Sequence, residues 1–251
     1  LSLAPHIYLF LFLLGLVVMY CFEITLVASV AAMMLFGLSA AYATATGVPY
    51  FVDSEIPTAV FLGLHLLVTD PSTSPRTQLG KSLFGMLYGL GVFLLYAVLG
   101  SLGVPTFYDK LLSVPLLNLS VRWIDRLVTM LQSRPTGSML NTQLLHSNAN
   151  VFHIATWGVM FFAMTALGST DGRHRGDSVP FWERACLEGR RNACIRLLQI
   201  EASYCADASA WSCNALGRHY ADGKIVQEDK ELALEFFGRA CELRFQPACL
   251  N

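Results

Sequence analysis

Charged residues are scarce in this sequence, and they are unevenly spread. They make up 14% of the 251 residues, and the formal net charge is −1. Because no basic stripe interleaved with aromatics is present, we expect no nucleic-acid binding. Residues 1–170 are apolar runs with charges in short breaks, whereas residues 171–251 are charged and carry six of the seven cysteines. This contrast predicts a helical membrane domain followed by a separate globular domain.

The short motifs of soluble enzymes are also missing. The sequence contains no nucleophile–base pair, no Walker loop and no Rossmann fingerprint. Its paired cysteines are separated by seven residues, whereas the cysteines of a zinc knuckle are separated by about two to four. We therefore predict neither a catalytic residue nor a metal site in this chain.

The first apolar run, Ile7–Tyr42, carries a single charge, at Glu23. One helix of that length would measure about 54 Å, well beyond a hydrocarbon core of roughly 30 Å. We therefore expect two membrane spans that turn at Phe22-Glu23.

A half helix is predicted next. Ile56–Val68 is apolar but shorter than the roughly 20 residues that a membrane span needs. It leads into a Pro/Ser/Thr-rich bend at residues 69–75 and then into the span Ser82–Gly103, for which Ser74-Pro75 is the expected cap and first-turn proline. Such broken helices are tolerated at membrane depth only where protein or a water-filled cavity surrounds them. On the second span, Gly85-x-x-x-Gly89 forms a small-residue face that suits close helix packing.

The rest of the apolar region has three parts. Lys110–Leu131 is a partly apolar segment interrupted by Pro115, residues 133–150 form a polar linker, and residues 151–169 form an additional transmembrane helix. The membrane half-domain is therefore expected to cover residues 1–132.

Polar residues in and after the half helix are the candidates for a cofactor or ion path. His65 is an ionisable group among leucines, a functional hypothesis by default, although it also fits a neutral imidazole bonded to a neighbouring helix. Asp70, at the end of the half helix, fits either a backbone cap or a contact to a cofactor or ion. The hydroxyls of the bend could contact a flavin phosphate or bond their own backbone: Thr69, Ser72, Thr73 and Thr77.

Positive residues predict the orientation in the membrane. The loop at residues 44–55 is acidic, and two other breaks are basic, carrying Arg76, Lys81, Arg122, Arg126 and Arg134. With the basic breaks in the cytoplasm, the additional span carries residues 170–251 to the periplasm, although Arg173 and Arg175 run against this.

The cysteines of the tail form three equally spaced pairs: Cys186 and Cys194, Cys205 and Cys213, and Cys241 and Cys249. Each pair is eight positions apart, and the second and third pairs are offset by 36 positions. Regular pairs of this kind predict disulfides in an oxidising compartment, which agrees with the orientation predicted from charge.

The stretch around the bend carries a resemblance to a known family. Thr69-Asp70-Pro71, followed by Thr77, Gly80, Lys81 and Gly85, resembles the NqrB/RnfD-like membrane subunits of ion-translocating oxidoreductases, and the match covers about residues 7–127, the C-terminal half of such a subunit. The resemblance implies an electron-transfer subunit associated with flavin (FMN). In that family the covalent flavin threonine lies in a Ser-Gly-Ala-Thr motif, which is absent here. We expect any such flavin to be carried upstream of residue 1, in a longer polypeptide.

The tail resembles the cysteine-rich Sel1-like repeats. The segment from Ala210 to Cys241 has the pattern of two amphipathic helices around a glycine turn, and its period of 36 suits a helical solenoid. In that family disulfides clamp successive helices, and Phe181–Cys186 begins an earlier, shorter copy. The resemblance implies a surface that docks a periplasmic protein.

These inferences predict an all-α protein: a polytopic helical membrane domain with a discontinuous half helix, plus a small α-solenoid. The expected protein is a multi-pass subunit of an electron-transfer complex in the bacterial inner membrane, with the lipid bilayer and other membrane subunits as partners. Two alternatives stay open. One is a cofactor-free structural or assembly subunit, and the other is a small-solute or ion channel, because discontinuous helices also build channels.

Overall fold

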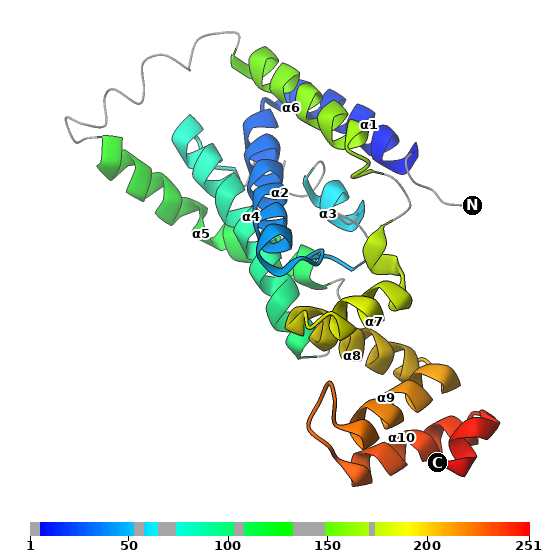
Figure 1. The fold of residues 1–251 in the computed structure, drawn as a ribbon. Helices are drawn as coiled ribbons and strands as arrows, with labels where there is room; N and C mark the ends of the chain where they lie inside the picture. The colour runs from blue at the N-terminus through cyan, green and yellow to red at the C-terminus, as the bar shows by residue number, and fades with distance from the viewer. Residues whose placement is uncertain (1–5, 53–57, 65–73, 103–107, 133–148, 171–173) are drawn as a thin grey trace. The chain divides into compact units, whose positions relative to one another are not determined.

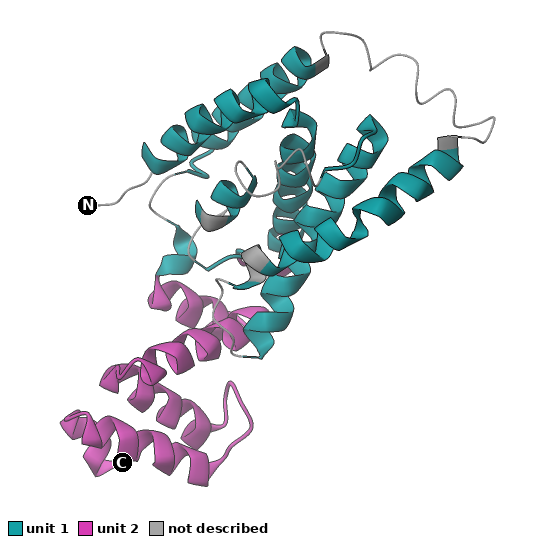
Figure 2. Ribbon diagram, turned by 180° about the vertical axis from the view of Figure 1, so that it is seen from behind, with its two compact units in different colours: residues 1–43, 49–177 teal, residues 44–48, 178–251 magenta. Residues whose placement is uncertain are grey.

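The computed structural model describes residues 6–52, 58–64, 74–102, 108–132, 149–170 and 174–251. Every regular element in these ranges is helical, which confirms the all-α class. The chain divides into two compact units, drawn in two colours in Figure 2. Unit 1 comprises Leu1–Ala43 and Pro49–Asp177, and unit 2 comprises Thr44–Val48 and Ser178–Asn251. This division groups residues 151–169 with the helices that precede them.

The first apolar run forms two helices, α1 (His6–Phe22) and α2 (Thr25–Thr46), as Figure 1 shows. The predicted turn at Phe22-Glu23 is confirmed. Glu23 adopts a left-handed conformation with φ 55°, and its backbone N–H donates to the carbonyl oxygen of Met19 at 3.0 Å. A left-handed residue other than glycine costs about 1–2 kcal/mol, so this tight reversal must be held by its surroundings.

The described part of the predicted half helix is α3 (Thr58–Leu62), and the helix beyond the bend is α4 (Gln78–Ser101). The two are separate helices, not parts of one long rod. Val60, Phe61 and Leu64 are completely buried, so protein encloses this short helix. Enclosure is the condition under which a helix can stop short of a full span.

Helix α5 (Tyr108–Gln132) runs through Pro115, so the predicted interruption is wrong. A proline inside a helix removes one backbone hydrogen bond. Residues on both sides of it, Val114 and Leu117, pack against the core of unit 1, and this packing holds the helix continuous. Helix α5 lies against α4.

Helix α6 (Ala149–Ala166) is the additional helix that the sequence predicts, and it packs along α1. The rings of Phe12 and Phe161 stack with their centroids 4.0 Å apart. Trp157, completely buried on the same face of α6, lies 6.2 Å from Phe61 of α3. Helices α1 and α6 therefore supply aromatic side chains around the short helix.

Within the described ranges, two helices are long and apolar enough to cross a membrane by length and composition, α2 and α4. Two shorter apolar helices, His6–Phe22 and Asn150–Ala166, accompany them. The sequence predicts five membrane segments and an additional span, so the structure supports part of that number by length and composition.

Glycines let α2 and α4 approach closely. A Cβ added to Gly85 would lie 2.6 Å from the carbonyl oxygen of Val27, and one added to Gly89 would lie 2.7 Å from that of Ala31. Both distances are too short for real atoms, so these positions cannot carry a side chain without moving the helices. The Gly85-x-x-x-Gly89 face therefore packs as the sequence predicts.

Unit 2 consists of four α-helices and a short terminal 3-10 turn. The helices are α7 (Val179–Leu187), α8 (Arg191–Ala206), α9 (Ala210–Asp222) and α10 (Lys230–Glu242), and the turn is η4 (Gln246–Leu250). Each helix lies against the next. Gly217 of α9 lies beneath the ring of Phe237, where an added Cβ would be 2.6 Å from the ring, so α9 and α10 meet closely.

Candidate functional site

Most of the predicted cofactor or ion-path residues lie outside the described residues. These are His65, Thr69, Asp70, Ser72 and Thr73. Thr77 is described, and it lies at the N-terminus of α4.

Thr77 caps α4, so the predicted cap at Ser74-Pro75 is wrong. The Thr77 hydroxyl accepts a hydrogen bond from the backbone N–H of Gly80 at 3.0 Å. Pro75 is buried close to Gly80 and lies before the first turn of α4 instead of within it. An N-cap side chain accepts a hydrogen bond from the backbone N–H two or three residues later. Thr77 stands at that distance from Gly80, whereas Ser74 does not. The Thr77 hydroxyl is therefore used by its own backbone.

A polar cluster holds the turn between α1 and α2. The Lys81 ammonium of α4 donates to the carbonyl oxygen of Glu23 at 3.0 Å. Asn150, at the start of α6, donates its amide to the carbonyl oxygen of Met19 at 3.3 Å and accepts from the Thr25 hydroxyl at 3.0 Å. The starts of α4 and α6 thus converge on one turn, which explains how the left-handed Glu23 is maintained.

The same end of unit 1 includes the second half of α5. The Asp125 carboxylate accepts from the backbone N–H of Arg76 at 3.3 Å, which joins α5 to the bend before α4. Arg76, Arg122 and Arg126 are exposed. We call this region, with the Lys81–Glu23–Asn150 cluster, the charged end of unit 1. The sequence locates its basic breaks, but only the fold brings them together.

The opposite end of unit 1 is aromatic. The Tyr50 hydroxyl donates to the carbonyl oxygen of Phe93, and the two rings stack at 3.9 Å. The Tyr96 hydroxyl accepts from the backbone N–H of Val52 at 3.2 Å. The His174 Nδ1 atom lies 2.9 Å from the carbonyl oxygen of Val52, which brings the segment after α6 to the same place. Sequence analysis did not single out this aromatic end.

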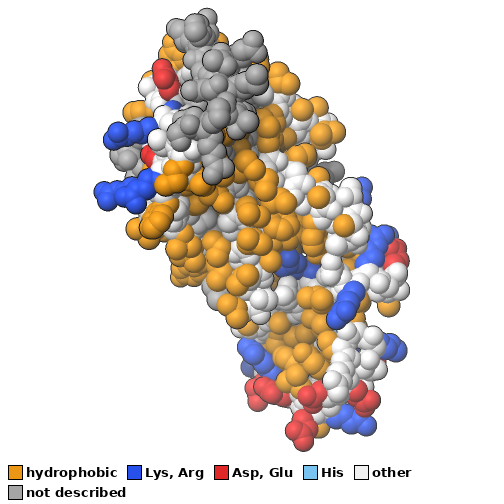
Figure 3. Space-filling view, turned by 90° about the vertical axis from the view of Figure 1, so that its left-hand side faces the viewer, with side chains coloured by type: hydrophobic (Ala, Val, Ile, Leu, Met, Phe, Trp, Pro, Cys, Tyr) orange, Lys and Arg blue, Asp and Glu red, His pale blue; other side chains and the backbone are white. Residues whose placement is uncertain are grey.

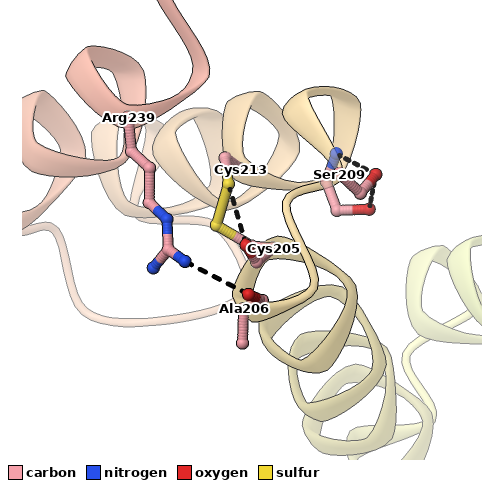
Figure 4. The surroundings of a disulfide bond; sticks show 6 residues. Cys205, Ala206, Ser209, Cys213 and Arg239 are labelled. Atoms are coloured by element: carbon pink, nitrogen blue, oxygen red, sulfur yellow. Dashed lines mark hydrogen bonds between the residues drawn. A yellow bond between two sulfur atoms is a disulfide. The ribbon is translucent and has the colours of Figure 1, made fainter. Parts of the chain in front are cut away.

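Three segments of unit 2, each between one helix and the next element, share the same structure. We call them corners, and they are residues 186–194, 205–213 and 241–249. Each corner is closed by a disulfide between its first and last residue, and the bonded pairs are Cys186 with Cys194, Cys205 with Cys213, and Cys241 with Cys249. The Cα atoms of these pairs are 4.6, 4.7 and 4.9 Å apart. They are the same three pairs that the sequence spacing predicts. Each disulfide connects the end of one helix to the element that follows it, as Figure 4 shows for the central corner.

The backbone of the three corners is also the same. The residue three positions after the first cysteine is left-handed in every case, namely Gly189, Ala208 and Arg244, with φ 85°, 65° and 67°. The backbone N–H of the next residue donates to the carbonyl oxygen of the residue just before the first cysteine, at distances of 3.1, 2.8 and 3.0 Å. This is the arrangement of a left-handed helix end that satisfies free carbonyl groups.

The three disulfides differ in their exposure to solvent. In the first corner, Cys186 is 8% exposed, and Cys194, near the start of α8, is half-buried. Cys205 and Cys213 are almost fully buried, whereas Cys249 is exposed. The central disulfide is thus part of the core of unit 2, and the last one is accessible to solvent.

Helix α10 contributes to the central corner. The Arg239 guanidinium donates to the carbonyl oxygen of Ala206 at 3.3 Å (Figure 4). Ser209 caps α9 by accepting from the backbone N–H of Ser212. The corner is therefore held by polar contacts as well as by its disulfide.

A close contact between a buried carboxyl group and an imidazole joins α8 to α9. The Glu201 side chain has no exposed surface, and its Oε2 atom lies 3.1 Å from Nε2 of His219. The angles fall outside hydrogen-bond limits, so the contact is a close approach of two polar side chains and not a hydrogen bond. Sequence analysis missed this pair, because no local spacing marks two residues that meet only when the helices pack.

No group of three or more His, Cys, Asp or Glu side chains in the described ranges could hold a metal ion. Comparisons with known protein families, curated proteins and solved structures found no match. The resemblance to NqrB/RnfD-like subunits and to Sel1-like repeats is therefore supported by no comparison and stays a prediction from the sequence.

Proposed function

We propose that this chain is an integral-membrane subunit of a larger complex, in which unit 1 spans the bacterial inner membrane and unit 2 docks a periplasmic protein. The sorting of polar groups in unit 1 is the observation that carries the proposal. Arg76, Lys81, Arg122 and Arg126 belong to one end, and the hydrogen-bonded Tyr50 and Tyr96 belong to the other. A basic cytoplasmic end and an aromatic belt are characteristic of helical membrane proteins.

The apolar surface of unit 1 supports membrane insertion. Side chains on α1, α4, α5 and α6 are more than half exposed although they are large and apolar: Phe10, Val17, Tyr20, Leu94, Val98, Leu119, Trp123, Phe152, Val159 and Phe162. A soluble monomer rarely exposes so much apolar surface, whereas a lipid bilayer would cover it.

A periplasmic unit 2 follows from this orientation. Helix α6 begins at the charged end, where Asn150 binds the α1–α2 turn, and the segment after it reaches the aromatic end through His174. The residues that follow would emerge on the side opposite the basic breaks. Three disulfides suit that side, because cytoplasmic thiols are kept reduced.

The complex that we propose is an electron-transfer assembly of the NqrB/RnfD-like kind, in which any FMN is carried outside residues 1–251. The separation of α3 from α4, and the aromatic enclosure of α3, support a broken helix of the type found in membrane electron carriers. In the described residues, the motif positions Thr77, Lys81 and Gly85 make structural contacts. This half would then support the fold while another part of the assembly carries the redox chemistry.

The same contacts favour a second candidate, a cofactor-free structural or assembly subunit. The channel alternative has less support, because Phe12, Phe61, Trp157 and Phe161 fill the space between α1, α3 and α6. Side chains packed at these distances leave no open path through that part of the unit.

The test combines membrane extraction with flavin detection. We expect the protein to stay in the membrane at alkaline pH, and a C-terminal alkaline phosphatase fusion to be active. Release at alkaline pH, or an inactive fusion, would contradict the membrane assignment or its orientation. Covalent flavin fluorescence from the natural polypeptide on a denaturing gel would favour electron transfer. Co-purification in a larger complex without flavin would favour the assembly subunit.

A further inference from the structure

Helix α5 has two apolar faces. One face is buried in unit 1, where Ile124 is 4% exposed and Val128 is fully buried. The other points away, and Leu119, Trp123 and Met130 are 79%, 71% and 66% exposed. Their spacing of four and seven positions places them in one stripe along the helix.

Basic side chains border this stripe at the charged end. Arg122 and Arg126 flank Trp123 in the sequence and are exposed, and the Arg126 guanidinium carbon lies 5.8 Å from the centroid of the Trp123 ring. Arg76 is held next to them, because its backbone N–H donates to Asp125. Figure 3 shows basic side chains projecting at the edge of a broad apolar surface.

These three guanidinium groups have no carboxylate partner among the described residues. Asp125 lies between Arg122 and Arg126 in the sequence, but it accepts a backbone N–H from the bend and is half-buried. Guanidinium groups bind phosphate through paired N–H donors. A tryptophan with an apolar body and a polar edge suits the boundary between hydrocarbon and headgroups.

We propose that Arg76, Arg122, Trp123 and Arg126 form a binding surface for anionic phospholipid headgroups on the cytoplasmic leaflet. The proposal rests on the membrane location proposed above and specifies what meets the basic end. The phosphates would pair with the arginines, and the acyl chains would cover Leu119, which precedes the arginines on α5. An apolar protein partner would account for the stripe but would leave three arginine charges unbalanced.

The test uses the full chain with Trp211→Phe, in nanodiscs of mixed phosphatidylglycerol and phosphatidylcholine. Because Trp157 and Trp182 are buried, Trp123 is then the exposed tryptophan. Bromine atoms are placed on one lipid at a time, and quenching of tryptophan fluorescence reports which lipid lies beside Trp123. Each surface arginine is worth about a fivefold preference for anionic lipid. We therefore expect brominated phosphatidylglycerol to quench preferentially, and the preference to fall about 25-fold in Arg122→Gln/Arg126→Gln.

The matched control is Lys224→Gln/Lys230→Gln, which removes two exposed positive charges from unit 2 and should leave the preference unchanged. Equal quenching by the two lipids in an inserted protein would overturn the lipid proposal and leave the membrane assignment intact. A protein that never enters the nanodisc would instead overturn the membrane assignment. Shielding of Trp123 from both lipids, with the mass of a dimer, would identify a second copy as the occupant and also overturn the proposal. Glycerol 3-phosphate added at millimolar concentration should not change the quenching, because the proposed ligand is a lipid and not a free phosphate.

Discussion

The two units keep their helices together by different means. In unit 1, α2 and α4 meet where Gly85 and Gly89 have no side chain, and its described free cysteine, Cys21, is exposed on α1. In unit 2, disulfides join the ends of successive helices. A long apolar unit can rely on contact between helices, whereas a short unit of four helices with a small core is strengthened by covalent links. The comparison predicts that different substitutions will destabilise the two units.

The largest loss of stability is expected from breaking the buried contact between Glu201 and His219 in unit 2. His219→Ala would leave the buried Glu201 carboxyl group without its polar neighbour and would open a cavity, and together these effects should lower the free energy of unfolding by about 3–5 kcal/mol. Hydrogen exchange across residues 178–251 of the full chain would measure this. The control is Lys224→Ala, which breaks an exposed pair with Asp222 and should cost less than about 1 kcal/mol. Equal losses in the two variants would mean that Glu201 does not depend on His219.

The disulfides of unit 2 should differ in their resistance to reductant. Removing the buried pair with Cys205→Ser/Cys213→Ser should cost about 2–4 kcal/mol. In the unaltered protein, the bond between Cys241 and Cys249 should be reduced first, because Cys249 is exposed. Timed alkylation followed by peptide mass spectrometry gives the order. Earlier reduction of the bond between Cys205 and Cys213 would contradict the burial seen in this corner.

Adding a side-chain carbon where α4 contacts α2 through glycine should lower the stability of unit 1. Gly85→Ala places a Cβ 2.6 Å from the Val27 carbonyl oxygen, and we expect a loss of about 1–3 kcal/mol from overpacking. Thermal unfolding in detergent would detect it. Gly158→Ala in α6 is the matched control, since nothing lies within 4 Å of the added carbon, and the better helix former should leave stability unchanged or raise it. A loss of similar size at both positions would show that packing against α2 is not the cause.

Substitutions at the left-handed corner residues should change the stability of unit 2 least. The change is expected to be a gain at one corner and a loss at another. Ala208→Gly should raise the stability of unit 2 by about 1 kcal/mol, because glycine adopts φ 65° without strain. Gly189→Ala, at the equivalent position of the first corner with φ 85°, should lower it by a similar amount. Hydrogen exchange of the flanking helices compares the two variants. Changes of the same sign would show that backbone conformation does not limit these corners.

The sequence alone predicts the features that depend on local composition. A charge in a long apolar run locates the turn at Phe22-Glu23, equal cysteine spacing identifies the three disulfide pairs, and two glycines identify a packing face. The start of α4 was mispredicted, because Ser74-Pro75 has the same local pattern as a cap, and only the packing of Pro75 close to Gly80 distinguishes it from Thr77.

Contacts between distant parts of the chain were beyond prediction. Asn150 lies 131 positions from Met19, and Glu201 meets His219 only because α8 and α9 pack together. Nothing in the residues around them marks these partners. Of the candidate site, the sequence therefore located the basic breaks but not the cluster that they form.

The turn at Glu23 has a consequence for biosynthesis. Its carbonyl oxygen and that of Met19 are the acceptors for Lys81 and Asn150, which are synthesised much later. The hairpin of α1 and α2 can therefore form before α4 and α6 are synthesised, and its carbonyl oxygens are then available to bind Lys81 and Asn150 as these helices leave the ribosome. Assembly of this unit would then proceed in the order of translation, with α6 arriving last to lock the hairpin in place.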